Sequence, residues 1–172
     1  MHRIAVSAFV LMIAGVAHAE TATVTMNKID ANGIGEAIGT MTLEDTPGGL
    51  KVTPSLKGLP AGARGFHVHA NADCGPGEAN GQKAAGLAAG GHFDPARTGK
   101  HLGPMGAGHQ GDMPVLTVAA DGTASAAVVA PHLKVADAKG HAIVIHAGGD
   151  NFSDQPAPLG GGGARIACGI VR

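Results

Sequence analysis

Tryptophan and tyrosine are absent from this 172-residue chain, and phenylalanine occurs only four times. We therefore expect alanine, valine, isoleucine and leucine to form most of the hydrophobic core. Basic residues are not in excess either, since 12 lysines and arginines face 13 acidic residues. Without a basic stripe, we expect no binding to nucleic acid or to an anionic membrane surface. No apolar run is long enough to span a bilayer.

The first 19 residues have the pattern of a secretory signal peptide. Arg3 precedes an almost uninterrupted apolar run over residues 4–16, and Ala17-His18-Ala19 is an A-x-A cleavage site. The alternative is an uncleaved anchor, for which the apolar run is short. Cleavage after Ala19 would leave one domain, residues 20–172, with 11 basic and 13 acidic residues once Arg3 is removed.

Cysteine is also scarce, with only Cys74 and Cys168 in the chain. Export implies an oxidising compartment, which favours one disulfide between them. A bridge that closes about 95 residues would stabilise the fold by roughly 4–5 kcal/mol in the loop-entropy model. The alternative is a pair of unlinked buried thiols. A thiolate metal site is disfavoured because the chain has no C-x-x-C pair.

Short β-like segments separated by glycine and proline account for most of residues 20–172. Asp121-Gly122 and Asn32-Gly33 are dipeptides that type I′ hairpin turns favour. Eight short strands predict an antiparallel Greek-key barrel or sandwich. The predicted strands are 21–29, 35–43, 49–57, 64–70, 115–120, 123–130, 141–147 and 164–171.

Two connections are too long for simple turns. The first loop, residues 71–113, has no convincing strand, and the second loop covers residues 148–163. Loops of this length are usually functional or disordered. The first loop carries Cys74 and four potential metal ligands, so we expect cross-links to order it.

Histidines gather in and beside these loops. His67 and His69 alternate with Phe66 and Val68, so both imidazoles should project from one face of a strand while the other two residues enter the core. His146 can face the same way from the strand 141–147. Imidazole suits both copper and zinc, and two imidazoles at i and i+2 can form half of a four-histidine copper site.

The first loop supplies a second set of donors within 21 residues. Three histidine nitrogens and one carboxylate form a closed four-coordinate set, which is how structural zinc is usually held. The alternative is a solvated loop dotted with histidine. The four residues of this set are His92, His101, His109 and Asp112.

Six motifs in order resemble the copper,zinc superoxide dismutases, in particular their bacterial secreted branch. They are GFHVHANADC, GGHFDP, KHLGP, GHQGDMP, IVIHAGGDN and GGGGARIACGIV. The resemblance extends over nearly all of residues 20–172. It implies an eight-stranded Greek-key barrel, a periplasmic location and superoxide as substrate. It also allows a homodimer through the extended segment between Cys74 and His92.

The resemblance further implies a role for each motif residue. One copper ion per chain would bind His67, His69, His92 and His146. One zinc ion would bind His92, His101, His109 and Asp112. Asp150 would link histidines of the two sites, Arg165 would attract superoxide to copper, and Cys74 and Cys168 would form the family's disulfide. His132 and His141 match no ligand position.

The implied reaction is the disproportionation of superoxide to oxygen and hydrogen peroxide. Copper would change oxidation state while zinc would not. His92, shared by both metals, would deliver a proton to the second superoxide. The alternative function is a non-catalytic periplasmic copper/zinc-binding protein, which needs the ligands but neither a shared histidine nor Arg165.

Overall fold

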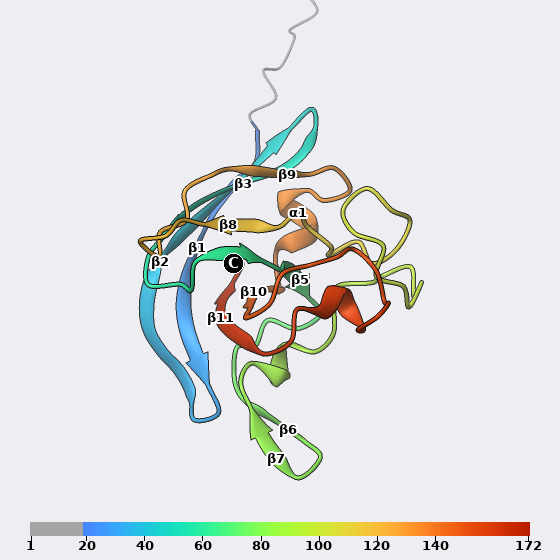
Figure 1. Cartoon of the computed structure of the whole chain (residues 1–172). Coiled ribbons are helices and arrows are strands. Elements are labelled where there is room, and N and C mark those ends of the chain that lie inside the picture. The colour runs from blue at the N-terminus through green and yellow to red at the C-terminus, as the bar shows by residue number, and fades with distance from the viewer. Residues whose placement is uncertain (1–18) are drawn as a thin grey trace, which may run out of the picture.

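The computed structural model describes residues 19–172 and consists almost entirely of strands and loops (Figure 1). The predicted signal peptide lies outside the described residues, except for its last residue. Two short 3-10 turns and a single helical turn accompany the strands. The elements are β1 (Thr21–Asp30), β2 (Gly33–Thr46), β3 (Gly49–Leu56), β4 (Gly62–Arg64), β5 (Phe66–His69), β6 (Gly77–Ala79), β7 (Gln82–Ala84), η1 (Leu87–Ala89), β8 (Leu116–Val118), β9 (Val128–Ala130), α1 (Val135–Ala138), β10 (Ala142–His146), η2 (Leu159–Gly161) and β11 (Arg165–Ile170).

The main sheet is antiparallel and curled. Seven strands are paired in the order β5-β10-β11-β1-β2-β3-β9. β4 and β5 continue one another across Gly65, and β4 pairs with β8 while β5 pairs with β10. After β8 the chain turns back, and a bridge between Leu56 and Ala124 joins the segment before β9 to the end of β3. This circuit confirms the predicted eight-stranded Greek-key barrel.

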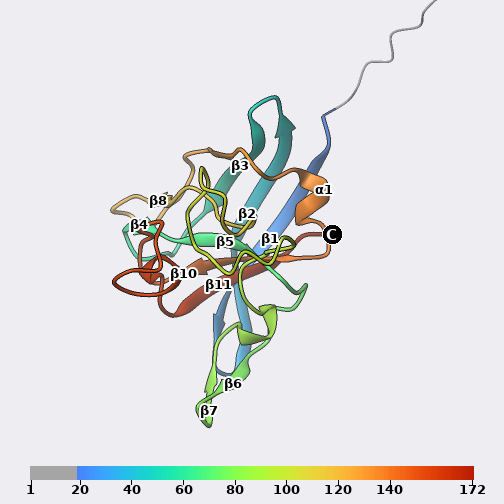
Figure 2. The ribbon, with the colours of Figure 1, turned by 90° about the vertical axis from the view of Figure 1, so that its right-hand side faces the viewer.

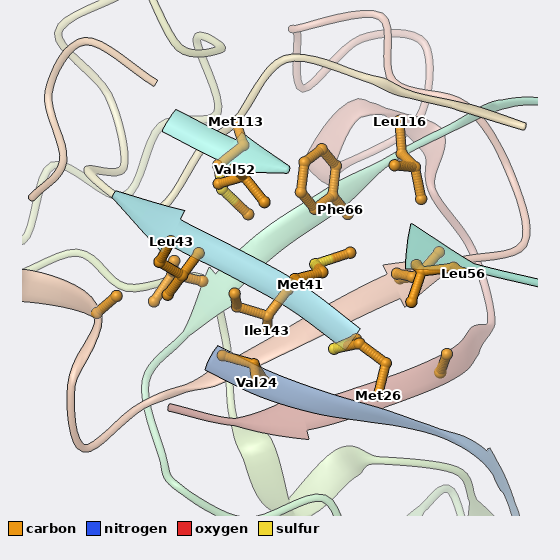
Figure 3. Close-up of a cluster of buried hydrophobic side chains, with 14 of the residues drawn as sticks. Val24, Met26, Met41, Leu43, Val52, Leu56, Phe66, Met113, Leu116 and Ile143 are labelled. Atoms are coloured by element: carbon orange, nitrogen blue, oxygen red, sulfur yellow. The ribbon is translucent and has the colours of Figure 1, made fainter. Parts of the chain in front are cut away.

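The interior of the barrel is aliphatic, with methionine added (Figure 3). Phe66 and Val68 are fully buried there, as the alternation along β5 predicts. Met41 and Met113 are also fully buried and take part of the volume that a richer set of aromatic rings would fill. Because β5 gives this face to the core, its histidines lie on the opposite face, beneath the long loops.

Both predicted turns exist, but neither has the predicted type I′ backbone, and the turn at Asp121-Gly122 does not join a hairpin, because β8 pairs with β4 and β9 pairs with β3. That turn needs a positive φ at both central residues, and only Gly33 and Gly122 adopt one, at 133° and 81°. In the first turn Gly33 already pairs with Asp30 in the sheet, and the Asp30 carboxylate accepts the N–H groups of Asn32 and Gly33. Aspartate at the first position and glycine at the fourth are typical of a type I turn.

The first loop contains a hairpin that the sequence analysis did not predict. β6 and β7 pair through Ala79 and Gln82, and the two residues between them have positive φ, 53° at Asn80 and 73° at Gly81. This is the backbone expected of a type I′ turn at Asn-Gly. In Figures 1 and 2 the hairpin projects away from the barrel. The expectation that residues 71–113 lack strands was therefore wrong at this point.

The first loop is nevertheless fastened to the barrel, as expected. A disulfide joins Cys74 to Cys168 on β11, which confirms the predicted bridge. The loop also runs beside β5, where the N–H of Val68 donates to Gly111 at 3.0 Å and its carbonyl accepts from Phe93 at 2.8 Å. Within the described residues, no helix has the length and apolar character that a membrane span requires.

Candidate metal centre

The barrel brings three predicted ligands together through strand pairing. β5 and β10 are antiparallel neighbours, with His67 opposite Val144 and His69 opposite Ala142. The register between β10 and β11 shifts at Ile145 and His146, where β10 ends. Such an irregularity can redirect a side chain, and Nε2 of His146 lies 3.4 Å from Nε2 of His69. The predicted outward projection of these side chains is therefore observed, although the loops bury all three.

His92 reaches the same place from the first loop. A bridge pairs its backbone with that of His69, and its ring stacks on that of His67 with centroids 3.9 Å apart. The candidate donor atoms of these four residues all lie within 4.8 Å of one another. We call this set the histidine pocket; it consists of His67, His69, His92 and His146.

Backbone carbonyls determine which nitrogen of two rings is available. Nδ1 of His69 lies 2.9 Å from the carbonyl oxygen of Gly90, and Nδ1 of His146 lies 3.3 Å from that of Gly163. A carbonyl only accepts, so each Nδ1 carries the proton and donates. Each Nε2 therefore keeps its lone pair, and both lone pairs face the histidine pocket.

The carboxylate of Asp150 fixes the proton position on His67, whose Nε2 donates to Oδ2 of Asp150 at 2.7 Å. Its Nδ1 is left buried without a hydrogen-bond partner, and so is Nε2 of His92. Orphaned buried polar atoms are rare in folded proteins and costly. A cation in the histidine pocket would satisfy them, so the donor set fits copper.

The second set of donors converges on one oxygen of Asp112. Nδ1 of His92 lies 2.9 Å from Oδ1, that of His101 lies 3.0 Å away and that of His109 lies 3.5 Å away. The other oxygen, Oδ2, accepts the N–H of Gly103. Nδ1 of His101 and of His109 are buried without a hydrogen-bond partner. We call His92, His101, His109 and Asp112 the carboxylate pocket; three nitrogens and one oxygen fit a tetrahedral zinc ion.

His67 lies close to both pockets, so it must be decided to which of them it belongs. Its donor atoms group by distance with His92, His101 and Asp112 as well as with the histidine pocket. The Nε2 atom of His67 is already bonded to Asp150, which leaves only Nδ1 for a metal. The partnerless Nδ1 of His109 completes the carboxylate pocket instead, and the side chain of His109 is only 9% exposed.

Asp150 connects the two pockets. Its Oδ2 accepts from His67 and its Oδ1 accepts from Nε2 of His101, both at 2.7 Å. The carboxylate therefore fixes the proton position on one ring of each pocket. Gly160, at φ 71°, lies directly behind this contact, since a Cβ there would stand 2.0 Å from Oδ1 of Asp150. Only a glycine leaves room for this bridge.

The two pockets have opposite effects on histidine protonation. Burial lowers the pKa of His67 to about 3, that of His69 to about 2 and that of His146 to about 4. Burial also lowers the pKa of His101, but the Asp112 carboxylate 3.0 Å from its Nδ1 and the hydrogen bond to Asp150 outweigh burial and raise that pKa to about 9. In the metal-free protein the histidine pocket thus stays neutral, whereas a proton on His101 balances the carboxylates.

Arg165 is anchored beside the histidine pocket by carbonyl groups. Its Nη1 donates to Gly86 at 2.5 Å and its Nη2 donates to Gly90 at 2.6 Å. The Gly90 carbonyl also accepts from His69, so one oxygen orients both side chains. Among residues 19–172 no carboxylate lies within ion-pair distance of Arg165. Its half-buried positive charge is therefore available to a small anion.

The comparisons with known proteins agree with this geometry. The family model described as copper/zinc superoxide dismutase matches residues 37–171. The chain belongs to this family. The Cu-Zn superoxide dismutase 2 of Salmonella typhimurium is 52% identical over 173 residues, which cover 100% of both chains. The activity is therefore the disproportionation of superoxide, and the cofactors are copper and zinc.

Two solved structures of this family resemble the fold closely. The Cu/Zn superoxide dismutase from Brucella abortus is 50% identical with a TM-score of 0.87 over 89% of this chain and 100% of that one. The monomeric copper, zinc superoxide dismutase from Salmonella enterica is 55% identical with a TM-score of 0.80 over the same shares. These likenesses confirm the family resemblance noted in the sequence.

The predicted metal ligands, Asp150 and Arg165 lie in or against the two pockets, Cys74 and Cys168 form the disulfide, and the two unassigned histidines belong to neither pocket. His132 is exposed, and His141 bonds to Ala70 through Nδ1 at 2.8 Å. Sequence reasoning missed the backbone acceptors Gly86, Gly90 and Gly163. No side-chain pattern marks a carbonyl group, so no sequence signal could have identified them.

The low pKa values in the histidine pocket predict how the metal-free protein responds to acid. Unfolded histidines titrate near pH 6.5, whereas His67, His69 and His146 stay neutral in the folded protein to about pH 4 or below. Between these values the unfolded state binds more protons. The free energy of unfolding should therefore fall as pH decreases, by about 1.4 kcal/mol per pH unit for each proton taken up.

Urea titrations of the metal-free protein between about pH 7 and pH 4.5 would measure this dependence. Below about pH 6 His101 does not oppose it, because its raised pKa keeps the ring protonated in the folded state and an unfolded histidine is also protonated there. The variant His69→Gln should reduce the slope, while His132→Gln, at an exposed position, should leave it unchanged. A stability that is constant over this range would contradict the prediction.

Proposed function

We propose that copper binds in the histidine pocket and zinc in the carboxylate pocket, with His92 shared by both. One observation carries this assignment. Nδ1 of His92 lies 2.9 Å from Asp112, while its Nε2 is buried without a partner on the side of His67 and His69. A single imidazole therefore presents one nitrogen to each pocket.

Copper, when bound, supplies the one-electron redox couple that takes an electron from one superoxide and returns it to another. Two superoxide anions and two protons thereby give one oxygen and one hydrogen peroxide. The protein must admit a small anion, exclude larger reductants and deliver a proton. His92 and His146 are 6% and 5% exposed, which restricts access to small molecules.

His92 is suited to hold and release one of the two protons at Nε2. Its Nδ1 is directed at the carboxylate pocket, so the ring keeps its position whether or not Nε2 carries a proton. Burial lowers the pKa of His92, and a proton placed on Nε2 is therefore easily given up. A general acid works best when its proton is neither too tightly nor too weakly held.

Arg165 would bind superoxide through its uncompensated charge. Its guanidinium is already fixed by Gly86 and Gly90, so little side-chain entropy is lost when an anion docks. Because Gly90 also fixes His69, the anion would be held at a constant distance from the histidine pocket. Positive charge in a low-dielectric cleft can raise association rates by roughly 10 to 10³.

The histidine pocket should be necessary for catalysis. We expect His146→Ala to reduce superoxide removal by at least about 100-fold, since even indirect supports of a metal site are worth up to that factor. Stopped-flow assays of protein loaded with both metals would measure the rate. Metal analysis should show one copper and one zinc per chain, with a copper paramagnetic resonance spectrum that changes when zinc is removed.

The matched control is His132→Ala, which removes an exposed imidazole outside both pockets and should leave the rate unchanged. Circular dichroism would show that both variants fold. Metal-loaded protein without catalytic activity would instead indicate the non-catalytic copper/zinc-binding protein.

Arg165 should affect capture of the substrate more than metal binding. We expect Arg165→Ala to lower kcat/KM by about 10-fold or more and to weaken its dependence on ionic strength, because the attracting charge is lost. Arg165→Lys keeps the charge but loses the planar fork of two nitrogens that contacts both carbonyls, so its kcat/KM should lie between those of the other two proteins. Equal kcat/KM values in all three proteins at equal copper content would exclude the proposed role.

We also propose that the chain is exported to the periplasm after cleavage behind Ala19. The leader pattern and the disulfide support this, since disulfides persist in oxidising compartments. Fractionation of a Gram-negative host should recover a periplasmic protein that begins at Glu20, and Ala17→Asp should block processing. Cytoplasmic full-length protein would contradict the proposal.

The family resemblance allows a homodimer as well as a monomer for the same exported protein. The Salmonella enterica relative is described as monomeric, which supports one chain per particle. Light scattering on the periplasmic preparation would give the mass directly.

A further inference from the structure

In the second loop, Asp154 as well as Asp150 forms a hydrogen bond with His101, which belongs to the carboxylate pocket. Asp154 accepts the backbone N–H of His101 on Oδ2 at 2.9 Å. Asp150, four residues earlier, accepts from Nε2 of the same histidine at 2.7 Å. His101 belongs to the first loop and is fully buried. Its backbone and the far side of its ring are thus both held by the second loop, which leaves Nδ1 facing Asp112.

The peptide unit that Asp154 holds also positions a second histidine. The carbonyl of Lys100 and the N–H of His101 belong to the same planar group. That carbonyl accepts the N–H of His109 at 2.9 Å. Asp154 on one edge and His109 on the other therefore fix the plane of this peptide. A rotation of the peptide would displace two of the three histidines in the carboxylate pocket.

The other oxygen of Asp154 stabilises the turn that supports Asp150. Oδ1 accepts the N–H of Leu159 at 3.2 Å, and Leu159 has a φ of 54°, which a branched side chain adopts at a cost. Gly160 follows and lies against the contact between Asp150 and His101. Loss of the Asp154 carboxylate would therefore loosen both supports of His101.

We propose that Asp154 is a positioning residue for zinc, acting through the peptide of His101 and the turn at Leu159. The inference rests on the proposed zinc site in the carboxylate pocket. The hydrogen bond from His101, followed by that from Leu159, lowers the pKa of Asp154, so the carboxylate is ionised and bound to backbone amides.

The test is the zinc affinity of the mature, disulfide-linked, copper-loaded protein, measured by competition with a chromophoric chelator. We expect Asp154→Ala to raise the zinc dissociation constant by about 10- to 100-fold, the usual effect of removing an indirect support of a metal ligand. Asp154→Asn keeps one acceptor oxygen and should recover part of the loss. The ligand-field spectrum of cobalt(II) in place of zinc should change in Asp154→Ala.

Asp30 provides a matched control, since its exposed carboxylate also accepts two backbone N–H groups, from Asn32 and Gly33, in a turn at the end of β1. Asp30→Ala should lower the stability of the metal-free protein to a similar degree without changing zinc affinity. A zinc dissociation constant for Asp154→Ala within about twofold of the unsubstituted protein, or an equal loss in Asp30→Ala, would overturn the proposal.

A further variant separates this proposal from the zinc site on which it depends. His109→Ala removes a donor of the carboxylate pocket and must weaken zinc binding if zinc binds there. Unchanged zinc affinity in His109→Ala would disprove the zinc site itself. A loss in His109→Ala with none in Asp154→Ala would disprove only the positioning role.

Discussion

The ring of His92 lies where two chemically different pockets meet, with Nδ1 2.9 Å from a carboxylate and Nε2 buried without a partner. The other residues of the two pockets surround that ring and supply the remaining donors. β5 contributes His67 and His69, β10 contributes His146, and the first loop brings His92 to them by backbone pairing with β5. The barrel therefore supplies rigidity, and the loops supply the second set of donors.

Burying these histidines changes their protonation and lowers the stability of the metal-free protein in acid. Burial is the main reason that the histidine pocket stays neutral, which makes its lone pairs available to a metal but lowers the stability of the protein in acid. The carboxylate pocket instead favours positive charge, and in the metal-free state the raised pKa of His101 lets a proton supply it. A zinc ion would replace that proton, so the two pockets differ in charge as well as in donor type.

The long loops remain compact because they are tied down at several separate points. The disulfide joins Cys74 to β11, backbone bonds hold residues 91–93 and 111 to β5, and two carboxylates of the second loop hold His101. None of these ties requires a hydrophobic core within the loops. Glycine is frequent there because several close approaches, such as that of Gly160 to Asp150, leave no room for a side chain.

Much of this molecule could be predicted from residue patterns. Alternation along β5 separates Phe66 and Val68 from the histidines, and donor types with short spacings indicate two metal sites, because these are local properties of the chain. The type I′ turn was wrong at Asp121-Gly122, where the flanking strands β8 and β9 pair with other strands. It was also wrong at Asn32-Gly33, since the register of β1 and β2, which decides which residues occupy the turn, depends on the whole sheet. The same dipeptide at Asn80-Gly81 does form the type I′ turn, in a loop where no strand was expected.

The sequence by itself therefore determined the fold class, the disulfide partners and the side chains available as donors. Only the tertiary structure decided which nitrogen of each ring faces a pocket and what holds the opposite nitrogen. Those partners are the carbonyls of Gly90 and Gly163 and the carboxylate of Asp150, between 17 and 83 residues away from the rings they hold. Such contacts depend on where the closed barrel places its loops, and a carbonyl group is the same in every residue.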